Sequence, residues 1–173
     1  GMGYVLDEGY DMPPLMLTAD ELEAAVLGAA MVAAQADPSL ARAARDLVAK
    51  LSAAIPDELR PVVMDGSTRS ITTPPLADQS FDGTIIRNAI RERFKLRLAY
   101  LDGAGVATER VIWPLLIAYL NSVRYIVAWC EKRNDYRHFK IDRVQSLDVL
   151  DGKYPGRRDV LIKGWEKAVV HAG

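Results

Sequence analysis

Basic and aromatic side chains alternate along residues 136–144. If this segment is a straight strand, Arg137 and Arg143 share one face and Lys140 lies on the other. A short charged loop joins it to the preceding segment, which carries Tyr125, so the two segments should pair as a hairpin. A tyrosine ring close to two guanidinium groups is suited to bind a base and its phosphate. The pattern therefore predicts a site for an anionic, base-bearing ligand.

A plainer interpretation of the two arginines is that they form surface salt bridges, which contribute little to stability. The carboxylates available for such pairs are Glu131, Asp135, Asp142 and Asp148. Within the same segment, His138 is expected to be a surface or packing residue rather than a catalytic base.

The sequence offers little for catalysis or for metal binding. One cysteine, Cys130, and two histidines, His138 and His171, argue against a disulfide framework and against a zinc site. No paired carboxylates and no nucleophile beside a base stand out, so we expect no enzymatic activity, no catalytic residue, no metal and no cofactor. The chain has no long apolar run and no signal-peptide pattern at its start, so we expect a cytoplasmic protein without a membrane partner.

Charge divides the 173 residues into two halves. Residues 1–80 hold 12 acidic and 5 basic side chains, a net charge of −7, whereas residues 81–173 hold 11 acidic and 17 basic ones, a net charge of +6. An acidic half followed by a basic half suggests two modules with different roles, and an anionic partner would bind the basic module.

The acidic half is expected to form a helical hairpin. Thr18 and Glu21 have capping-box spacing at the start of a helix over about 18–34, and Asp37, followed by proline, caps a second helix over about 38–55. A small barrel cannot cover all of the apolar surface of these helices. We therefore expect a homodimer formed through them.

The basic half should form one helix followed by short strands. The helix carries Ile86, Ala89, Ile90 and Phe94, and the expected strands cover residues 96–100, 106–113, 115–120, 123–130 and 136–141, with 143–150 continuing from the last. Pro114 is expected to interrupt the chain between two of these strands. Short strands at this spacing favour a small barrel, so the predicted fold class is α+β, a helical hairpin followed by a barrel. The predicted boundaries are 1–64 for the helical module, 65–80 for a linker and 81–154 for the barrel with its helix. Residues 155–173 are expected to be an amphipathic C-terminal tail or the start of a C-terminal extension.

Residues 85–150 resemble a WYL domain, a ligand-sensing module of bacterial transcription regulators that carry DeoR-type DNA-binding heads. The matching stretches are Ala89–Arg93, Leu98–Tyr100, Trp113–Leu115, Arg124–Cys130 and Arg137–Val144. Upstream, Gly3–Leu6, Pro13–Leu15 and Leu17–Glu21 resemble the region after the winged helix-turn-helix of such regulators. The triplet Trp-Tyr-Leu that names the family is Arg124-Tyr125-Ile126 in this chain.

The resemblance implies an Sm-like, SH3-type barrel whose ligand surface combines the triplet tyrosine with basic residues of the next strand. The residues at these positions are Tyr125, Arg137, Lys140 and Arg143, and the implied ligand is nucleotide-like or a single-stranded nucleic acid. No helix-turn-helix precedes Gly3, so operator DNA would be bound only through a head that this sequence lacks. The expected function is effector sensing in a transcription regulator, and the alternative is a free-standing module that binds single-stranded nucleic acid.

Overall fold

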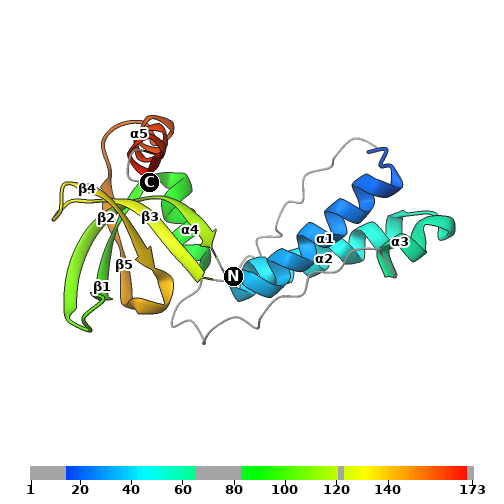
Figure 1. The fold of residues 1–173 in the computed structure, drawn as a ribbon, viewed down its shortest axis with the longest axis horizontal. Helices are drawn as coiled ribbons and strands as arrows, with labels where there is room; N and C mark the ends of the chain where they lie inside the picture. The colour runs from blue at the N-terminus through cyan, green and yellow to red at the C-terminus, as the bar shows by residue number, and fades with distance from the viewer. Residues whose placement is uncertain (1–14, 65–82, 121–122, 171–173) are drawn as a thin grey trace, which may run out of the picture.

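The computed structural model describes residues 15–64, 83–120 and 123–170 of the chain, which form a helical hairpin beside a sheet domain (Figure 1). The predicted linker at 65–80 and the predicted turn at 121–122 lie outside the described residues. The same is true of His171 and of the upstream stretch Gly3–Leu6.

The hairpin consists of α1 (Ala19–Gln35) and α2 (Pro38–Ala54), close to the predicted bounds. The Glu21 amide donates to Thr18 Oγ1 at 3.2 Å and the Thr18 amide donates to the Glu21 carboxylate at 2.8 Å, so the predicted capping box is confirmed. Asp37 caps α2, as predicted. The hairpin is followed by the single-turn η1 (Asp57–Leu59) and by α3 (Arg60–Met64).

The sheet domain is a five-stranded antiparallel sheet in the order β4-β3-β2-β1-β5. Its strands are β1 (Phe94–Leu101), β2 (Ala107–Leu120), β3 (Val123–Cys130), β4 (Asp135–Lys140) and β5 (Val144–Lys153). The class α+β is confirmed. The sheet is not closed, because within the described residues no ladder joins its edge strands β4 and β5, so a closed barrel is not confirmed.

The prediction that Pro114 separates two strands is wrong. The segments on either side of it form the single strand β2. The pairing of β2 with β3 shifts register between Pro114 and Leu116. Proline is tolerated at such a bulge, where the ladder does not need its missing amide. Ile112 pairs with Leu96 on one side and with Cys130 on the other, so β2 connects the two halves of the sheet.

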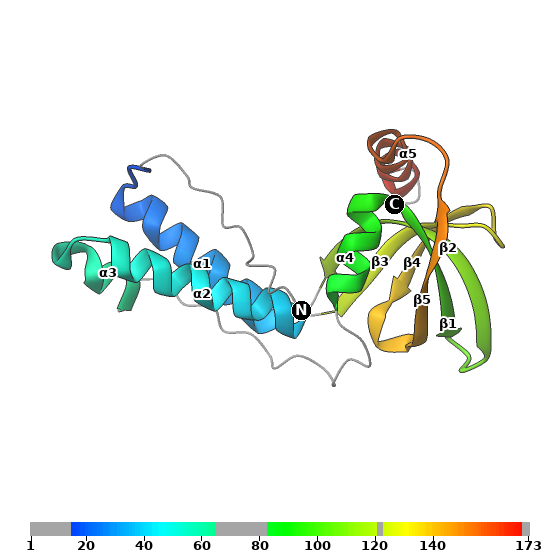
Figure 2. The same ribbon diagram turned by 180° about the vertical axis from the view of Figure 1, so that it is seen from behind.

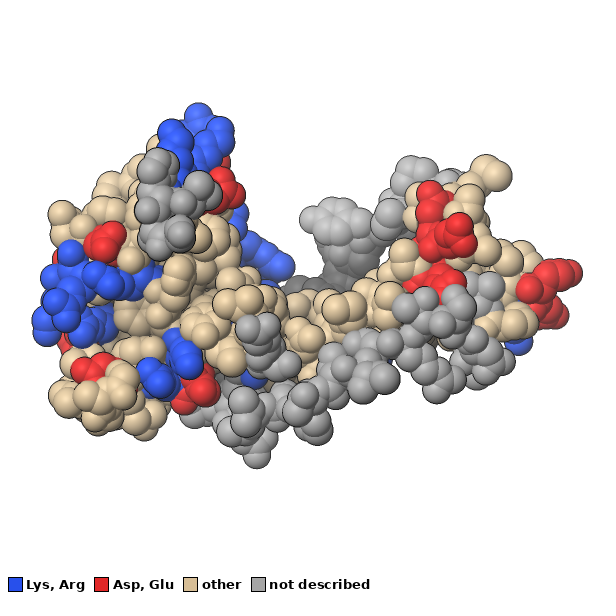
Figure 3. Space-filling model, in the orientation of Figure 1, with Lys and Arg blue, Asp and Glu red and all other residues tan. Residues whose placement is uncertain are grey.

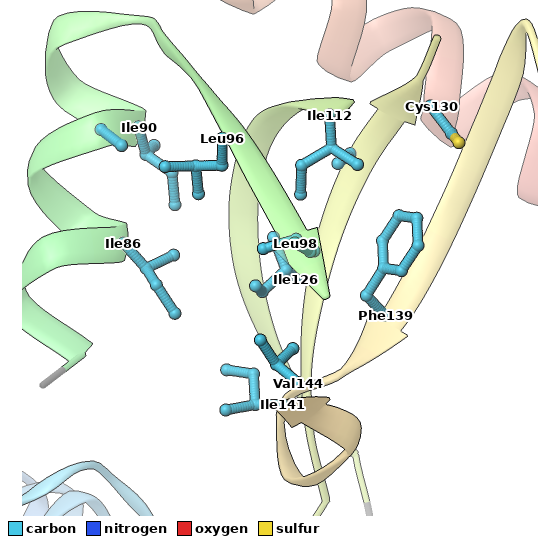
Figure 4. Close-up of a cluster of buried hydrophobic side chains, with 12 residues drawn as sticks. Ile86, Ile90, Leu96, Leu98, Ile112, Ile126, Cys130, Phe139, Ile141 and Val144 are labelled. Atoms are coloured by element: carbon cyan, nitrogen blue, oxygen red, sulfur yellow. The ribbon is translucent and has the colours of Figure 1, made fainter. Parts of the chain in front are cut away.

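One face of the sheet, which we call the inner face, is packed against α4 (Gly83–Glu92). Ile86 and Ile90 of this helix point toward the sheet residues of the core (Figure 4). The buried side chains of the inner face are Leu96, Leu98, Ile112, Ile126, Ala128, Cys130 and Phe139. The helix predicted around Ile86, Ala89 and Ile90 is therefore confirmed, and it begins the sheet domain. Its predicted extension to Phe94 is wrong, because α4 ends at Glu92 and Phe94 begins β1.

The opposite, outer face carries aromatic side chains and is covered in part by α5 (Arg158–Val170), shown in red in Figures 1 and 2. Trp113 stacks on Trp129 and on Tyr154, with ring centroids 6.1 and 5.9 Å apart. The Trp165 indole of α5 donates to His138 Nε2 at 2.8 Å. Sequence analysis predicted only an amphipathic tail here. In the described part of the chain, no helix combines the length and apolarity needed to cross a bilayer.

Candidate anion-binding site

The predicted site residues do not all lie on one face of the sheet. In the β3–β4 ladder Tyr125 lies directly opposite Lys140, whereas Arg137 lies opposite Ala128. Because residues opposite each other project to the same side, Tyr125 and Lys140 share the outer face and Arg137 lies on the inner face. The prediction that Tyr125 lies beside Arg137, with Lys140 apart from them, is wrong. The turn after Cys130 sets the register of the β3–β4 ladder, and this register decides on which face of the sheet each side chain lies.

Arg143 is not part of a straight strand with Arg137. It belongs to the single-turn helix η2 (Ile141–Arg143), which reverses the chain between β4 and β5. Its Nη1 lies 3.8 Å from where a Cβ at Gly103 would be, so this side chain extends to the turn between β1 and β2. Arg137 pairs with Asp135 at 3.3 Å, and more than half of each side chain is exposed, so the surface salt bridge considered above does form for this arginine.

A pocket of about 370 Å³ opens at one end of the inner face. It lies between the β1–β2 and β3–β4 hairpins, and we call it the arginine pocket. The residues that define it are Tyr100, Asp102, Arg110, Arg133, Arg137 and Phe139. Of the residues predicted for the ligand site, only Arg137 lines this pocket.

Arg110 is the residue of this pocket that sequence analysis missed. It lies opposite Leu98 in the β1–β2 ladder, so it points to the same side as the buried core. Its Nε donates to Thr108 Oγ1 at 3.2 Å, while its Nη1 is buried and has no hydrogen-bond partner within the described residues. A buried guanidinium N–H without an acceptor costs free energy, which an anionic ligand would recover.

The aromatic wall of the arginine pocket is held in place by its own contacts. The Tyr100 and Phe139 rings meet edge to face with centroids 5.1 Å apart. The Tyr100 hydroxyl accepts the backbone N–H of Lys140 at 3.2 Å. Phe139 is only 4 % exposed, so it forms the floor of the pocket rather than a surface for stacking. A ligand would therefore meet an arginine rim above an apolar floor.

The balance of charge in the arginine pocket is positive. The Asp102 Oδ1 accepts the amides of Ala104 and Val106, both at 2.9 Å, so this oxygen is engaged by the β1–β2 turn. With Asp135 beside Arg137, two carboxylates face three guanidinium groups. Figure 3 shows Lys and Arg gathered on the sheet domain and Asp and Glu at the far end of the helical hairpin, as the charge division predicts. Guanidinium groups in this setting bind phosphate or carboxylate.

His138 makes a packing contact rather than a catalytic one. Its ring meets Trp165 edge to face with centroids 5.9 Å apart, and burial lowers the pKa of the imidazole below its usual 6.5. Its Nε2 is occupied as the acceptor of the indole N–H, so it is not free to accept a proton from a ligand. Over the three described ranges, the His, Cys, Asp and Glu side chains form no group of three that could hold a metal ion.

Three comparisons with known proteins show what this chain is similar to. The family model named WYL domain matches residues 84–149. Protein PafC of Mycobacterium leprae (strain TN) is 29 % identical over 146 residues, which cover 80 % of this chain and 42 % of PafC. Proteasome accessory factor B/C (PafBC) of Arthrobacter aurescens is 27 % identical with a TM-score of 0.43, covering 83 % of this chain and 22 % of that one. The chain thus spans about two fifths of PafC; its residues 84–149 match the WYL domain and the chain is similar in sequence to PafC.

Proposed function

We propose that this chain is the effector-sensing part of a bacterial transcription regulator and that the arginine pocket binds its effector. The observation that carries the proposal is the buried Arg110 Nη1, which has no hydrogen-bond partner among the described residues and lies on the core side of the sheet. The WYL domain and the similarity to PafC support a regulatory rather than an enzymatic role.

The proposed effector is nucleotide-like or a single-stranded nucleic acid. A pocket of about 370 Å³ falls in the range that small ligands occupy. Arg133 and Arg137 at the rim would hold a phosphate by bidentate contacts, and Arg110 would meet a second acceptor deeper in the pocket. No bond of the ligand is made or broken on this proposal. Binding instead acts by linkage, because the ligand favours the arrangement of the chain to which it binds more tightly.

Variants of the pocket arginines test this proposal. Arg110→Gln and Arg137→Gln should each weaken the binding of adenosine monophosphate or of a short single-stranded DNA by about tenfold, measured by calorimetry. Arg97→Gln is the matched control, because Arg97 is an exposed arginine on the outer face, paired with Glu109 at 3.7 Å. Equal binding by the parent and the two pocket variants would overturn the assignment.

The same titrations separate the sensor from the free-standing nucleic-acid module. A sensor for a small effector binds the mononucleotide as tightly as a longer strand. A nucleic-acid module binds more tightly as the strand lengthens, and its affinity falls steeply with salt. On our proposal operator DNA is bound by a helix-turn-helix outside this sequence, so the chain alone should not shift a duplex in the presence of excess competitor DNA.

We further propose a homodimer formed through α1 and α2. An apolar groove of about 490 Å³ runs between these helices and is lined by Val26, Ala29, Ala30, Ala33, Ala34, Ala44, Arg45 and Val48. Met31 and Leu47 are 44 % and 48 % exposed on the same helices, and a second copy would cover such a surface. Light scattering should give twice the chain mass for the parent and the single mass for Ala30→Glu. A monomeric parent would refute the proposal.

A further inference from the structure

A second pocket, of about 380 Å³, lies where α2, α4, β2 and α5 meet. We propose that this junction pocket binds an amphipathic anion, a molecule with an apolar body and one carboxylate head. The inference is independent of the effector site, because the two pockets share no lining residue.

The floor of the junction pocket is apolar and comes from three elements. It is formed by Leu40 of α2, Ile90 of α4, and Leu116 and Ile117 of β2. Ile90 belongs to the core, and Ile117 packs against it, so the floor is fixed by the fold. An alkyl chain or a hydrocarbon ring bound here would bury its own apolar surface and that of the floor. Burial of apolar surface stabilises a complex by roughly 25 cal/mol for each Å² removed from water.

The polar side of the junction pocket carries Arg87, Arg91 and Arg158. Arg87 is already paired with Asp37, and it also donates to Thr84 Oγ1 at 3.1 Å. The Arg158 Nε donates to the Leu115 carbonyl at 2.7 Å, and its other nitrogens have no hydrogen bond to the residues that the structure describes. Arg91 is exposed and forms no hydrogen bond or ion pair with any residue that the structure describes.

These contacts leave Arg91 and the outer nitrogens of Arg158 for a ligand head. The Asp37 carboxylate is paired with Arg87. Tyr119 adds a donor, because burial and then the charge of Asp37 raise the pKa of its phenol, which stays protonated at neutral pH. One carboxylate could therefore accept from two guanidinium groups and a hydroxyl.

A molecule in the junction pocket would contact both parts of the protein. Leu40 belongs to the helical hairpin, whereas the other lining residues belong to the sheet domain and to α5. Binding would hold α2 against α4, next to the ion pair of Asp37 and Arg87. A ligand of the junction pocket therefore needs both an apolar body and a negative charge, and a molecule with only one of them should bind weakly.

Decanoate is the probe for this proposal, with decanol and butyrate as its two halves. By calorimetry on the whole chain, decanol and butyrate should each bind at least about tenfold more weakly than decanoate. Arg91→Gln should weaken decanoate binding by about tenfold, and Leu40→Gln should do the same by placing an amide on the apolar floor.

Two arginine variants serve as matched controls. Arg45→Gln changes an exposed arginine of the α1–α2 groove, and Arg97→Gln changes an exposed arginine of β1 that pairs with Glu109. Both should bind decanoate like the parent. The proposal is overturned if decanoate does not bind, if Arg91→Gln binds it as tightly as the parent, or if Arg45→Gln weakens it equally. A lower melting temperature of Arg91→Gln with unchanged binding would also overturn it, since Arg91 would then serve only the end of α4.

Discussion

Asp37 and Arg87 are 50 positions apart in the chain, and their ion pair joins the helical hairpin to the sheet domain. Asp37 is 3 % exposed, and its Oδ1 also accepts the amides of Ser39 and Leu40 at 3.2 and 3.3 Å. One carboxylate therefore caps α2 and pairs with α4. A residue that the sequence identifies as a helix cap is also the contact between two modules.

Asp37→Ala should lower the free energy of unfolding by about 3 kcal/mol or more, because it removes a cap and leaves a largely buried guanidinium unpaired. Urea unfolding measures the change. The control is Asp57→Ala, which breaks the exposed pair with Arg60 at 2.9 Å and should cost at most about 0.5 kcal/mol. Equal losses in the two variants would contradict the role given to Asp37.

Gly83 lies against the same carboxylate. A Cβ at this residue would be 2.5 Å from Asp37 Oδ2, so Gly83→Ala should displace Asp37 and destabilise the fold by about 1–3 kcal/mol. The control is Gly28→Ala in α1, where a Cβ meets nothing within 4 Å. That variant should stabilise α1 by about 0.5–1 kcal/mol, since alanine is the better helix former. Thermal melts of the two variants should move in opposite directions.

The contact between His138 and Trp165 should make the docking of α5 depend on pH. The indole donates to Nε2, which is possible only while that nitrogen carries no proton. Because burial lowers the folded-state pKa, the unfolded chain takes up the proton more readily. The stabilisation is complete above about pH 6.5 and is lost as the pH falls below that value.

His138→Gln offers a matched variant, since the glutamine amide oxygen can accept the indole N–H but does not titrate. Tryptophan fluorescence and melting temperature should be followed for both proteins from about pH 7.5 to about pH 5. The parent should lose stability relative to His138→Gln over this range. A constant difference between the two would show that His138 is not the titrating group.

Glu131 should contribute a second pH-dependent stabilisation, which is lost at lower pH than that of His138. Hydrogen bonds from Lys95 and then Trp113, both at 2.7 Å, hold the pKa of its carboxyl below the usual 4.5. A depressed folded-state pKa gives stability that is present above about pH 4.5 and is lost as the pH falls through the folded-state value.

Glu131→Gln should therefore be less stable than the parent at neutral pH, and this difference should shrink as the solution is acidified. Urea unfolding at a series of pH values measures it. Glu109→Gln is the control, because Glu109 is exposed and its ion pair with Arg97 is long, at 3.7 Å, and therefore weak. The same pH dependence in both variants would argue against the contacts of Glu131.

The starts of α1 and α2 are predicted to within a residue because their signals are local. Thr18 with Glu21, and Asp37 with the proline after it, satisfy backbone amides within one turn of chain. Alternation likewise predicts the strands, except that the single strand β2 is predicted as two. Each of these features depends on a few residues that are neighbours in the sequence, so the sequence alone is enough to predict it.

The faces of the strands could not be predicted in the same way. Whether Tyr125 faces Lys140 or Arg137 depends on a turn that pairs Cys130 with Asp135 and holds Asn134 at φ 50°. Arg110 and Ile112 lie on the same side of the predicted strand 106–113, but alternation alone does not show that this side faces the core. Alternation shows that a strand has two sides, but the pairing partner decides which side is buried.

Strand β2 contributes Arg110 to one pocket and Tyr119 to the other. The nine residue steps between them extend over about 30 Å, with the bulge at Pro114 in the middle. Two small molecules held at these ends cannot exclude one another sterically. An influence between them can pass along this shared strand, and also through the core, which contains Ile90 of one pocket and Phe139 of the other. A chain built in this way can hold both molecules at once, so its output would depend on their combination and not on a competition between them.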